Sequence, residues 1–492
     1  METVKTQQIS MNDLMERAGN AVFKWISNNL DVINCDFIIL CGFGNNGGDG
    51  LVLARLLKQT GAFVKVFIMN NQYFTEDNLI NQDRLAQTGV TIEFFDAQKM
   101  LHIPKNCILI DALFGYGLNR PIDQVWNMFF EQINQAGNQV ISIDIPSGMY
   151  CDRLNSENDL IIQSDICLTF ESPKLSMFWP ENAEHLQNFE ILEIGFSPEA
   201  VEKQNSNWIY ANNLLISKFK KVRKRFAYKY NFGNVLVIGG SHGKMGAVHL
   251  CSKAVMRSGA GLVTAYTPKC GETILQTTFP EAMLMTDFSE NKIIGFPNAN
   301  RFDTLAIGPG IGTDEKTAFA FEQFLTENDL KHKKLIVDAD GINLIAQNQT
   351  LLKLLPPNTV LTPHDKELER LVGKWNNTPE KIEKIMNLVE SYQLVLVSKG
   401  AFSQIFLPDK RIFINSTGNS GMATAGAGDV LTGIIAGLMG AGYEPGEAAV
   451  LGNFLHGKSG DLAAENLGME SLIASDIIDF LPQAFQSVFN DY

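Results

Sequence analysis

The sequence has no cysteine pair of the C-x-x-C type and no apolar stretch as long as a membrane helix. Its seven cysteines are scattered through 492 residues, mostly in apolar or small-residue surroundings. This pattern predicts buried, reduced thiols in a cytoplasmic protein. No run approaches the roughly 18 consecutive apolar residues of a transmembrane helix, and the N-terminus has no apolar segment of the signal-peptide kind. We therefore expect a soluble intracellular protein without a membrane partner.

Positive charge is also scarce. Lys and Arg total 40 against 54 Asp and Glu, which gives a formal net charge of −14. Such a balance argues against an electrostatic grip on nucleic acid or on an anionic membrane. The exception is the basic run KFKKVRKR at 218–225. A solvated linker or a phosphate-contacting rim explains this run better than a nucleic-acid site does, so no nucleic-acid partner is expected.

The chain is too long for one ordinary core, and its apolar runs fall into two series. The first series predicts helices over 50–60 and 75–88 and strands over 37–42, 64–69, 91–95, 107–115, 140–148, 166–170 and 189–195. The second predicts helices over 246–258 and 430–438 and strands over 235–241, 261–266, 304–312, 335–341, 359–364, 394–400 and 411–415.

Strands separated by helix-length spacers are typical of parallel sheets covered on both faces. The fold class is therefore α/β, with two three-layer αβα domains in tandem, of which the first is Rossmann-like. We expect the first domain over 1–212, a basic linker over 213–232 and the second domain over 233–492.

The segment 41–50, CGFGNNGGDG, contains the G-x-G-x-x-G spacing of a dinucleotide-binding loop. Such a loop needs an acidic residue about 20 positions on, at the end of the next strand. The strand over 64–69 ends instead in Asn70 and Asn71, which disfavours a dehydrogenase. Residues 45–50 offer amide donors for an anion and side-chain oxygens for a cation. The alternative is an Asx-rich turn whose side chains bond only their own backbone.

Two further strands of the first half end in polar residues. Asp111 precedes the glycine-rich stretch 115–121, and Asp144 precedes Ser147. A single acidic residue at a strand end can be the N-cap of the next helix. Because three such ends occur in one domain, we expect them to converge at one site beyond the carboxyl ends of the strands.

The blocks LMERAG (14–19), GNNGGDG (44–50), DALFGYGLNRP (111–121), DIPSG (144–148) and SPK (172–174) resemble the YjeF N-terminal family of NADHX and NADPHX epimerases. The resemblance implies that NAD(P)HX is bound by Asn45, Asn46, Gly47, Gly48 and Asp49, and by Gly115, Tyr116, Gly117, Leu118, Asn119, Arg120 and Pro121. It implies K+ ligation by Asn46, Asp111 and Ser147, a catalytic acid/base at Asp144, and a homo-oligomer. Family members usually carry a further segment before LMERAG, so this sequence is expected to have either a late start or a trimmed first helix.

The second half lacks a P-loop, because Met245 stands where the motif begun at 239–244 needs Ser or Thr. Its main signal is the run of small residues at 423–428, directly before an apolar helix expected at 430–438. A helix N-terminus with converging amides binds anions, and Asp429 is placed to take a proton from an attacking hydroxyl. The alternative is a small-residue helix packed closely on a sheet.

The blocks IGGSHGKMGA (238–247), IGPGIG (307–312), DADGIN (338–343), LTPHDKELERL (361–371), SKG (398–400) and GNSGMAT (418–424) resemble the ribokinase-like ADP/ATP-dependent NAD(P)H-hydrate dehydratases. The resemblance implies NAD(P)HX contacts from Ala247, Gly310, His364 and Asp429. It implies AMP/ADP contacts from Lys399, Gly400, Ala401, Phe402, Ser403 and Gly428. The family loop often has a second glycine where this chain has Ala425, so we expect an anion hole built from 426–428.

The two resemblances together imply repair of hydrated nicotinamide cofactor. One domain would interconvert the R and S epimers of NAD(P)HX through Asp144 at a K+ site. The other would dehydrate the S form with Asp429 as base, at the expense of ADP or ATP, with Mg2+ bridging the nucleotide phosphates. Two alternatives stay open: a small-alcohol kinase of the ribokinase superfamily, and an N-terminal domain that only binds. His364 alone is also typical of a surface or N-cap histidine.

Overall fold

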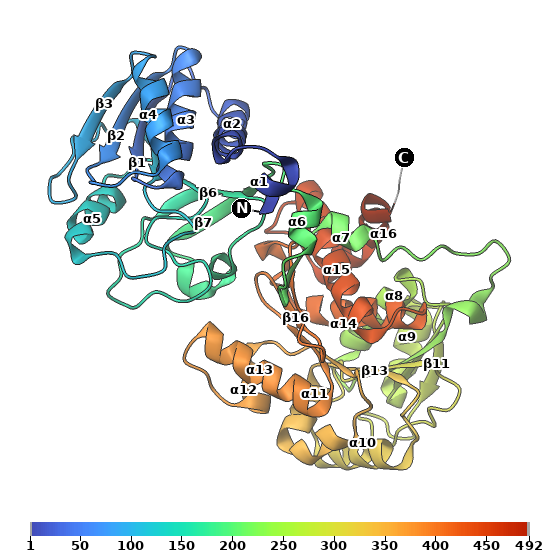
Figure 1. Cartoon of the computed structure of the whole chain (residues 1–492). Coiled ribbons are helices and arrows are strands. Elements are labelled where there is room, and N and C mark those ends of the chain that lie inside the picture. The colour runs from blue at the N-terminus through green and yellow to red at the C-terminus, as the bar shows by residue number, and fades with distance from the viewer. Residues whose placement is uncertain (1, 490–492) are drawn as a thin grey trace. The chain divides into compact units, whose positions relative to one another are not determined.

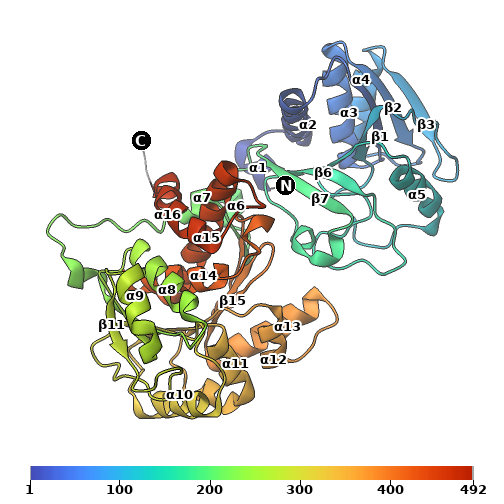
Figure 2. The same cartoon turned by 180° about the vertical axis from the view of Figure 1, so that it is seen from behind.

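The computed structural model of this chain describes residues 2–489, and it divides into two compact units, Met1–Asn205 and Ser206–Tyr492 (Figures 1 and 2). Each unit contains a mainly parallel sheet with helices on both faces, which confirms the predicted fold class. No helix among the described residues has both the length and the apolarity needed to cross a membrane.

The sheet of the first unit has seven parallel strands in the order β3-β2-β1-β4-β5-β6-β7. All seven were predicted, and their bounds are β1 Asp36–Cys41, β2 Phe63–Met69, β3 Thr91–Phe95, β4 Cys107–Ala112, β5 Val140–Ile143, β6 Ser164–Phe170 and β7 Leu186–Leu192. The strand order reverses between β1 and β4. A crevice at such a switch point is where open parallel sheets bind ligands.

Alternating side chains of β1 build the two cores of this unit. Phe37 and Ile39 belong to the core under α2 and α3, whereas Ile38 and Leu40 belong to the core under α5. The two-residue period of a strand produces this division. The helices are α1 Glu2–Gln7, α2 Met11–Asn29, α3 Asn45–Gln59, α4 Glu76–Ala86, α5 Asn127–Gln135 and α6 Pro198–Glu202.

The sheet of the second unit has ten strands in the order β11-β10-β9-β12-β13-β14-β15-β16-β17-β8. Their bounds are β8 Trp208–Ala211, β9 Asn234–Ile238, β10 Leu262–Thr267, β11 Met283–Thr286, β12 Thr304–Ile307, β13 Lys334–Val337, β14 Val360–Leu361, β15 Val395–Ser398, β16 Gln404–Phe406 and β17 Ile412–Asn415. Only β16 is antiparallel to its neighbours. The short strands β8, β11 and β16 were not predicted.

Helices cover both faces of this sheet as well. Val235 and Val237 of β9 face the core under α8, α14, α15 and α16, and Leu236 and Ile238 face the core under α10 to α13. The helices are α7 Asn213–Ser217, α8 Met245–Arg257, α9 Glu272–Thr278, α10 Glu315–Glu327, α11 Asp340–Gln347, α12 Asp365–Val372, α13 Thr378–Tyr392, α14 Ala427–Gly440, α15 Pro445–Leu467 and α16 Ala474–Phe489.

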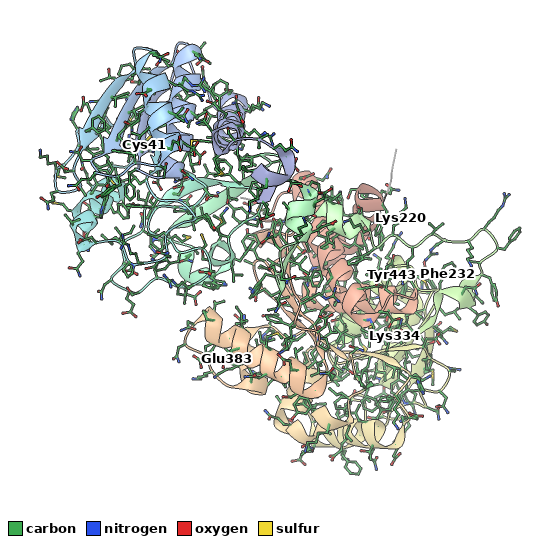
Figure 3. All side chains as sticks on the ribbon, in the orientation of Figure 1. Cys41, Lys220, Phe232, Lys334, Glu383 and Tyr443 are labelled. Atoms are coloured by element: carbon green, nitrogen blue, oxygen red, sulfur yellow. The ribbon has the colours of Figure 1, made fainter. Side chains whose placement is uncertain are left out.

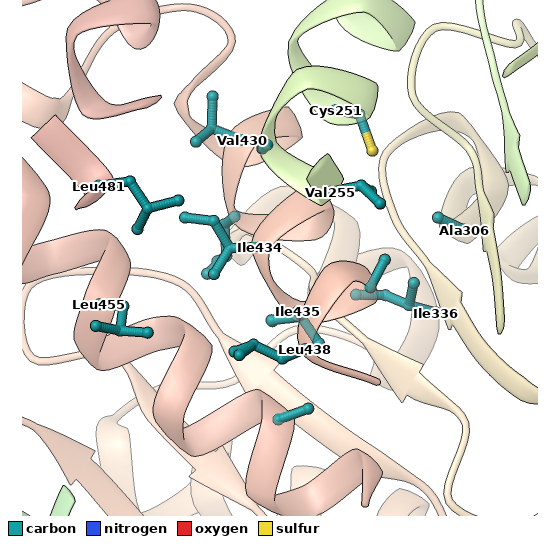
Figure 4. Packing of buried hydrophobic residues seen from close by; sticks show 14 of the residues in the cluster. Cys251, Val255, Ala306, Ile336, Val430, Ile434, Ile435, Leu438, Leu455 and Leu481 are labelled. Atoms are coloured by element: carbon teal, nitrogen blue, oxygen red, sulfur yellow. The ribbon is translucent and has the colours of Figure 1, made fainter. Parts of the chain in front are cut away.

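Helix α14 is buried on all sides, and this fixes its N-terminus in space. Figure 4 shows Ile434 of α14 beside Leu481 of α16, and Cys251 and Val255 of α8 belong to the same core. A Cβ atom at Gly433 would lie only 2.2 Å from the backbone oxygen of Cys251, so α14 and α8 approach closely through glycine. The alternative of a closely packed small-residue helix therefore describes the packing correctly, and it does not compete with a ligand at the N-terminus.

The boundary expected at 212 is corrected to the position between Asn205 and Ser206. Strand β8 pairs in parallel with β17 and so belongs to the second sheet. The segment 213–232 is not a separate linker. Its Lys221 ammonium lies 4.3 Å from the centre of the Tyr443 ring, and its Arg223 donates to the backbone oxygen of Gly259 at 2.5 Å; Figure 3 labels Tyr443.

Candidate active sites

Helix α3 begins at Asn45, earlier than the expected residue 50, because glycine removes the side chains that would block it. A Cβ at Gly47 would lie 1.9 Å from the backbone oxygen of Gly42, and one at Gly42 would lie 1.9 Å from that of Leu113. Only glycine permits backbones to approach so closely. The expected loop over 45–50 is thus corrected to the first turn of α3, with Gly44 as N-cap.

Asn46 lies in this turn with its amide group available for a ligand. The residue is 9% exposed, and neither its Oδ1 nor its Nδ2 has a hydrogen-bond partner in the described chain. A Cβ at Gly115 would lie 3.0 Å from the Asn46 side chain, so the 115–121 loop passes directly beside it. A buried amide without a partner demands an explanation. The Asx-turn alternative, in which this side chain bonds its own backbone, is wrong for Asn46.

Asp111 at the end of β4 is a fully buried hydrogen-bonding hub. Its Oδ2 accepts from the Ser147 amide at 2.8 Å and from Ser142 Oγ at 2.9 Å, and its Oδ1 accepts from Ser147 Oγ at 2.5 Å. Ser147 Oγ in turn accepts from the Phe114 amide at 2.9 Å. Burial raises the pKa of Asp111, and the bonds from Ser147 and Ser142 counteract it. These contacts place two of the three predicted K+ ligands, Asp111 and Ser147, in direct contact.

Asp144 is paired with Lys174, a partner that sequence analysis did not assign. The Lys174 ammonium lies 2.6 Å from Asp144 Oδ1 and donates to Thr169 Oγ1 at 2.9 Å. The Tyr116 amide donates to Asp144 Oδ2 at 3.3 Å. Asp144 has φ +69°, a strained value for a residue with a side chain, and such strain is concentrated at functional sites.

The rest of the predicted epimerase set surrounds these groups. Asp49 is buried, and burial together with the charge of Asp144 raises its pKa well above the usual range. The loop from Tyr116 to Pro121 is mostly exposed, with Tyr116 at 75%. A cavity of about 260 Å³ lies at the far end of this loop, and Pro121 is the one predicted site residue in its lining. The three polar strand ends of this unit therefore do meet, as predicted.

The N-terminus of α14 forms the corresponding feature of the second unit. Gly426 is its N-cap with φ +91°, and Ala427 is the first helical residue. The amides of Gly428 and Asp429 have no acceptor within the described residues, and that of Ala427 has only the Thr424 oxygen at 3.4 Å. The Gly426 amide likewise has no acceptor within the described residues. Free donors therefore lie at Gly426 and Gly428 of the expected 426–428 and continue to Asp429.

Asp429 lies in this first turn with a pKa raised to about 7. Burial is the main cause and the charge of Asp338 adds to it, whereas Lys399 lowers the pKa. Asp340 and Glu367 raise it further. A carboxylate with a pKa close to neutrality is well suited to general base catalysis.

Lys399 projects from the end of β15 towards the same point. Its ammonium lies 2.8 Å from Asp338 Oδ1, and a Cβ at Gly428 would lie 3.3 Å from it. Residues 400–403 form the turn between antiparallel β15 and β16, closed by Ser403 Oγ, which donates to Gly400 O at 3.0 Å. Of the predicted nucleotide set, Lys399 therefore lies beside Gly428, and Gly400, Ala401, Phe402 and Ser403 form the adjoining turn.

The predicted NAD(P)HX contacts of this unit lie at neighbouring strand ends. A Cβ at Gly310 would lie 3.3 Å from the Ala247 Cβ, so these two residues adjoin. His364 is the N-cap of α12, where its Nδ1 accepts from the amides of Lys366 and Glu367 at 3.1 and 3.3 Å. The N-cap alternative for His364 is therefore correct. This role leaves Nε2 as the protonated nitrogen of the neutral ring.

The comparisons with known proteins cover both units. A family model described as YjeF-related protein N-terminus matches residues 11–176, and one described as NAD(P)H-hydrate dehydratase matches residues 235–483. The bifunctional NAD(P)H-hydrate repair enzyme of Moorella thermoacetica is 34% identical over 495 residues, which cover 96% of this chain and 92% of that protein. This chain belongs to the bifunctional NAD(P)H-hydrate repair enzyme family.

Other repair enzymes of this family show similar coverage. The protein of Thermofilum pendens is 33% identical, with 97% of this chain and 93% of that protein covered. The solved structure of a ribokinase-like superfamily protein from Enterococcus faecalis matches with a TM-score of 0.52 and 27% identity, and covers 58% of this chain and 99% of that one. The family assignment favours a repair enzyme over the small-alcohol kinase that the sequence had left open.

Several residues around the two sites of this family member escaped sequence analysis. Each of these residues hydrogen-bonds to a residue of a site, and none belongs to a motif that indicates this role. They are Asn78, Asp338, Thr432 and His456. Asn78 is buried and donates to the backbone oxygens of Gly42 and Gly44. His456 hydrogen-bonds the Ala427 oxygen at 2.9 Å, and burial lowers its pKa to about 4, so the neutral ring donates to that oxygen. Lys174 lies in the SPK block and Asp338 in the DADGIN block, so the family resemblance could have indicated a role for these two residues.

Proposed function

We propose that the first unit interconverts the R and S epimers of NADHX and NADPHX, and that the second converts the S form to NADH or NADPH while ADP or ATP becomes AMP or ADP and phosphate. The observation that carries the proposal is the first turn of α14, where two amides without acceptors lie beside a carboxylate with a pKa of about 7. This is the arrangement that a phosphoryl transfer to a hydroxyl requires.

The dehydration would proceed in two steps because hydroxide is a poor leaving group. Asp429 would take the proton from the C6 hydroxyl as its oxygen attacks the terminal phosphorus of the nucleotide, and the bond from that phosphorus to the nucleotide would break. Phosphate would then leave C6 as C5 loses a proton, which forms the C5–C6 double bond. The amides of Gly428 and Asp429 would stabilise the charge on the transferring group.

The nucleotide would lie between the β15–β16 turn and the start of α14. The Lys399 ammonium lies beside Gly428 there, and an ammonium group and a helix N-terminus both favour phosphate. Mg2+ would be held mainly by phosphate oxygens and water and would neutralise the charge that develops on them. His364, Ala247 and Gly310 would contact the hydrated nicotinamide.

Epimerisation would use the Asp144–Lys174 pair. Inversion at C6 requires the hydroxyl to leave one face of the ring and a water oxygen to add to the other, with a proton delivered and then taken back. A carboxylate that is hydrogen-bonded to an ammonium can move such a proton. Asn45 to Asp49 and Gly115 to Pro121 would hold the phosphates and the ring beside it.

The K+ ligands would be Asn46, Asp111 and Ser147. The amide oxygen of Asn46 is buried without a partner, and the Asp111 carboxyl is fully buried. A buried carboxylate needs a compensating charge, and an oxygen-lined site beside a pyrophosphate suits a cation. The residues present therefore fit a monovalent cation, which would supply positive charge next to the substrate phosphates.

The direct test of the proposed function is conversion of NADHX. Purified protein incubated with an R and S mixture of NADHX, ADP, Mg2+ and K+ should restore the NADH absorbance completely, because epimerisation supplies S-NADHX as it is consumed. Recovery of only the S fraction would contradict the epimerase assignment. Absence of any NADH with both ADP and ATP would contradict the dehydratase assignment.

Removal of K+ provides the second test. We expect epimerisation to fall at least tenfold when Na+ replaces K+ with the total salt constant, and Asn46→Ala to raise the K+ concentration for half-maximal activity by a similar factor. Asn188→Ala is the matched control, because Asn188 is exposed on β7 and belongs to no predicted site; its K+ dependence should equal that of the wild type. A rate independent of the cation would refute the K+ site.

A further inference from the structure

Asp338 is a buried carboxylate beside the dehydratase site, and the proposed chemistry gives it no role. It follows β13 directly and is 1% exposed. Its Oδ1 lies 2.8 Å from the Lys399 ammonium, and its Oδ2 accepts from Thr432 Oγ1 at 2.6 Å. Both carboxylate oxygens are thus bonded to groups from other elements, one from the end of β15 and one from α14.

The contacts of Asp338 determine where the Lys399 ammonium lies. Without such a partner, the long, flexible side chain of Lys399 would sample many rotamers, and ordering it on phosphate binding would cost conformational entropy. Thr432 lies one turn after Gly428 on α14 and anchors the carboxylate to that helix. The ammonium is consequently held 3.3 Å from the position of a Cβ on Gly428, beside the amides without acceptors.

We propose that Asp338 is a positioning residue, which holds the Lys399 ammonium at the N-terminus of α14 so that a transferring phosphoryl group meets the cation and the helix amides together. The inference rests on the proposed dehydratase function and adds a residue to it. Asp338 itself would touch neither nucleotide nor NAD(P)HX, because it is 1% exposed and its two oxygens face Lys399 and Thr432.

A purely structural role for Asp338 predicts different behaviour. If the carboxylate only joined β13 to α14, its loss would lower stability and leave nucleotide affinity unchanged. If it acted only by repelling anions, its loss would strengthen nucleotide binding. Positioning predicts the opposite, because a released Lys399 contributes less to phosphate binding.

The charges that face Asp429 give a second readout. They come from four elements: Asp338 after β13, Asp340 on α11, Glu367 on α12 and Lys399 after β15. His456 on α15 is neutral near pH 7, because burial lowers its pKa to about 4. Asp338 raises the pKa of Asp429 and Lys399 lowers it. Lys399→Met should therefore move the acid midpoint of the pH–rate profile up. In Asp338→Asn, loss of the Asp338 charge lowers the midpoint while release of Lys399 raises it, so positioning predicts a smaller downward shift than loss of the charge alone would give.

The experiment compares Asp338→Asn, Thr432→Val and Thr432→Ser in the full-length chain. Binding of ADP with Mg2+ is measured by calorimetry, folding by thermal unfolding, and kcat and KM for ADP across pH by NADH formation. We expect Asp338→Asn to weaken ADP binding at least tenfold and to lower kcat. Thr432→Val should weaken ADP binding several-fold. Thr432→Ser, which keeps the hydroxyl, should bind ADP with the wild-type affinity.

Unchanged or tighter ADP binding in folded Asp338→Asn would overturn the inference. If that variant does not fold, equal ADP affinities for Thr432→Val and wild type would overturn it instead. The proposed function fails separately: wild-type protein that binds ADP but leaves NADHX unchanged refutes the dehydratase assignment, and the ADP affinities of the variants still decide the role of Asp338.

Discussion

Asp429→Asn is expected to lower the rate of S-NADHX dehydration by about 10²–10⁴-fold, the usual contribution of a positioned general base. The amide cannot accept the C6 hydroxyl proton, whereas its size leaves the packing of α14 intact. In the wild type, the pKa of Asp429 is raised to about 7, so the active, deprotonated form is lost as the pH falls through that value. Dehydration should then decline about tenfold per pH unit below it, as measured by NADH formation at saturating ADP.

The same Asp429→Asn protein supplies its own control. Its epimerase unit is unchanged, so R and S NADHX, separated by chromatography, should still interconvert at the wild-type rate. Glu465→Gln removes an exposed carboxylate on α15 and should leave dehydration unaffected. If Asp429→Asn retained more than a tenth of the wild-type rate, Asp429 would not be the base.

Asp144→Asn should reduce epimerisation by a similar factor of about 10²–10⁴, because the carboxylate that moves the proton is lost. When the variant is incubated with the R and S mixture of NADHX, ADP, Mg2+ and K+, the S fraction should be consumed at the wild-type rate and the R fraction should remain. Lys174→Met should give the same pattern, since it removes the ammonium 2.6 Å from Asp144.

Asp152→Asn is the matched control for that experiment, because it removes an exposed carboxylate from the same unit. It should consume both epimers as the wild type does. Normal epimerisation in Asp144→Asn would instead favour the alternative in which the first unit only binds its ligand.

Much of this fold could be predicted because apolar strands alternate with helix-length spacers. All seven strands of the first sheet were found in this way. The short strands β8, β11 and β16 were missed, because three or four residues are too few to show a clear strand period, and the pairing that places them in the sheet involves distant strands. The true domain boundary was missed for the same reason.

The sites were predictable where backbone geometry demands particular residues. Glycines at 42 and 47 are fixed by contacts under 2 Å that any Cβ would make, and the small residues before Asp429 permit the N-terminus of α14. The start of α3 was predicted too late because glycine disfavours an isolated helix. In the folded chain, however, the close backbone approach at Gly47 requires glycine in the first turn of α3. The roles of Asp338 and His456 depend on neighbours far away in the chain, which spacing cannot reveal.

The burial of α14 has a consequence for the strength of the phosphoryl site. Every residue of this helix from Val430 to Gly440 is buried, so the medium around its axis is protein of low dielectric constant. Mobile ions screen charges in such a medium far less than charges in water. The first turn itself is only half-buried at Gly428 and Asp429. Its partial positive charge is therefore screened by salt less than that of a surface helix, but not fully shielded from it.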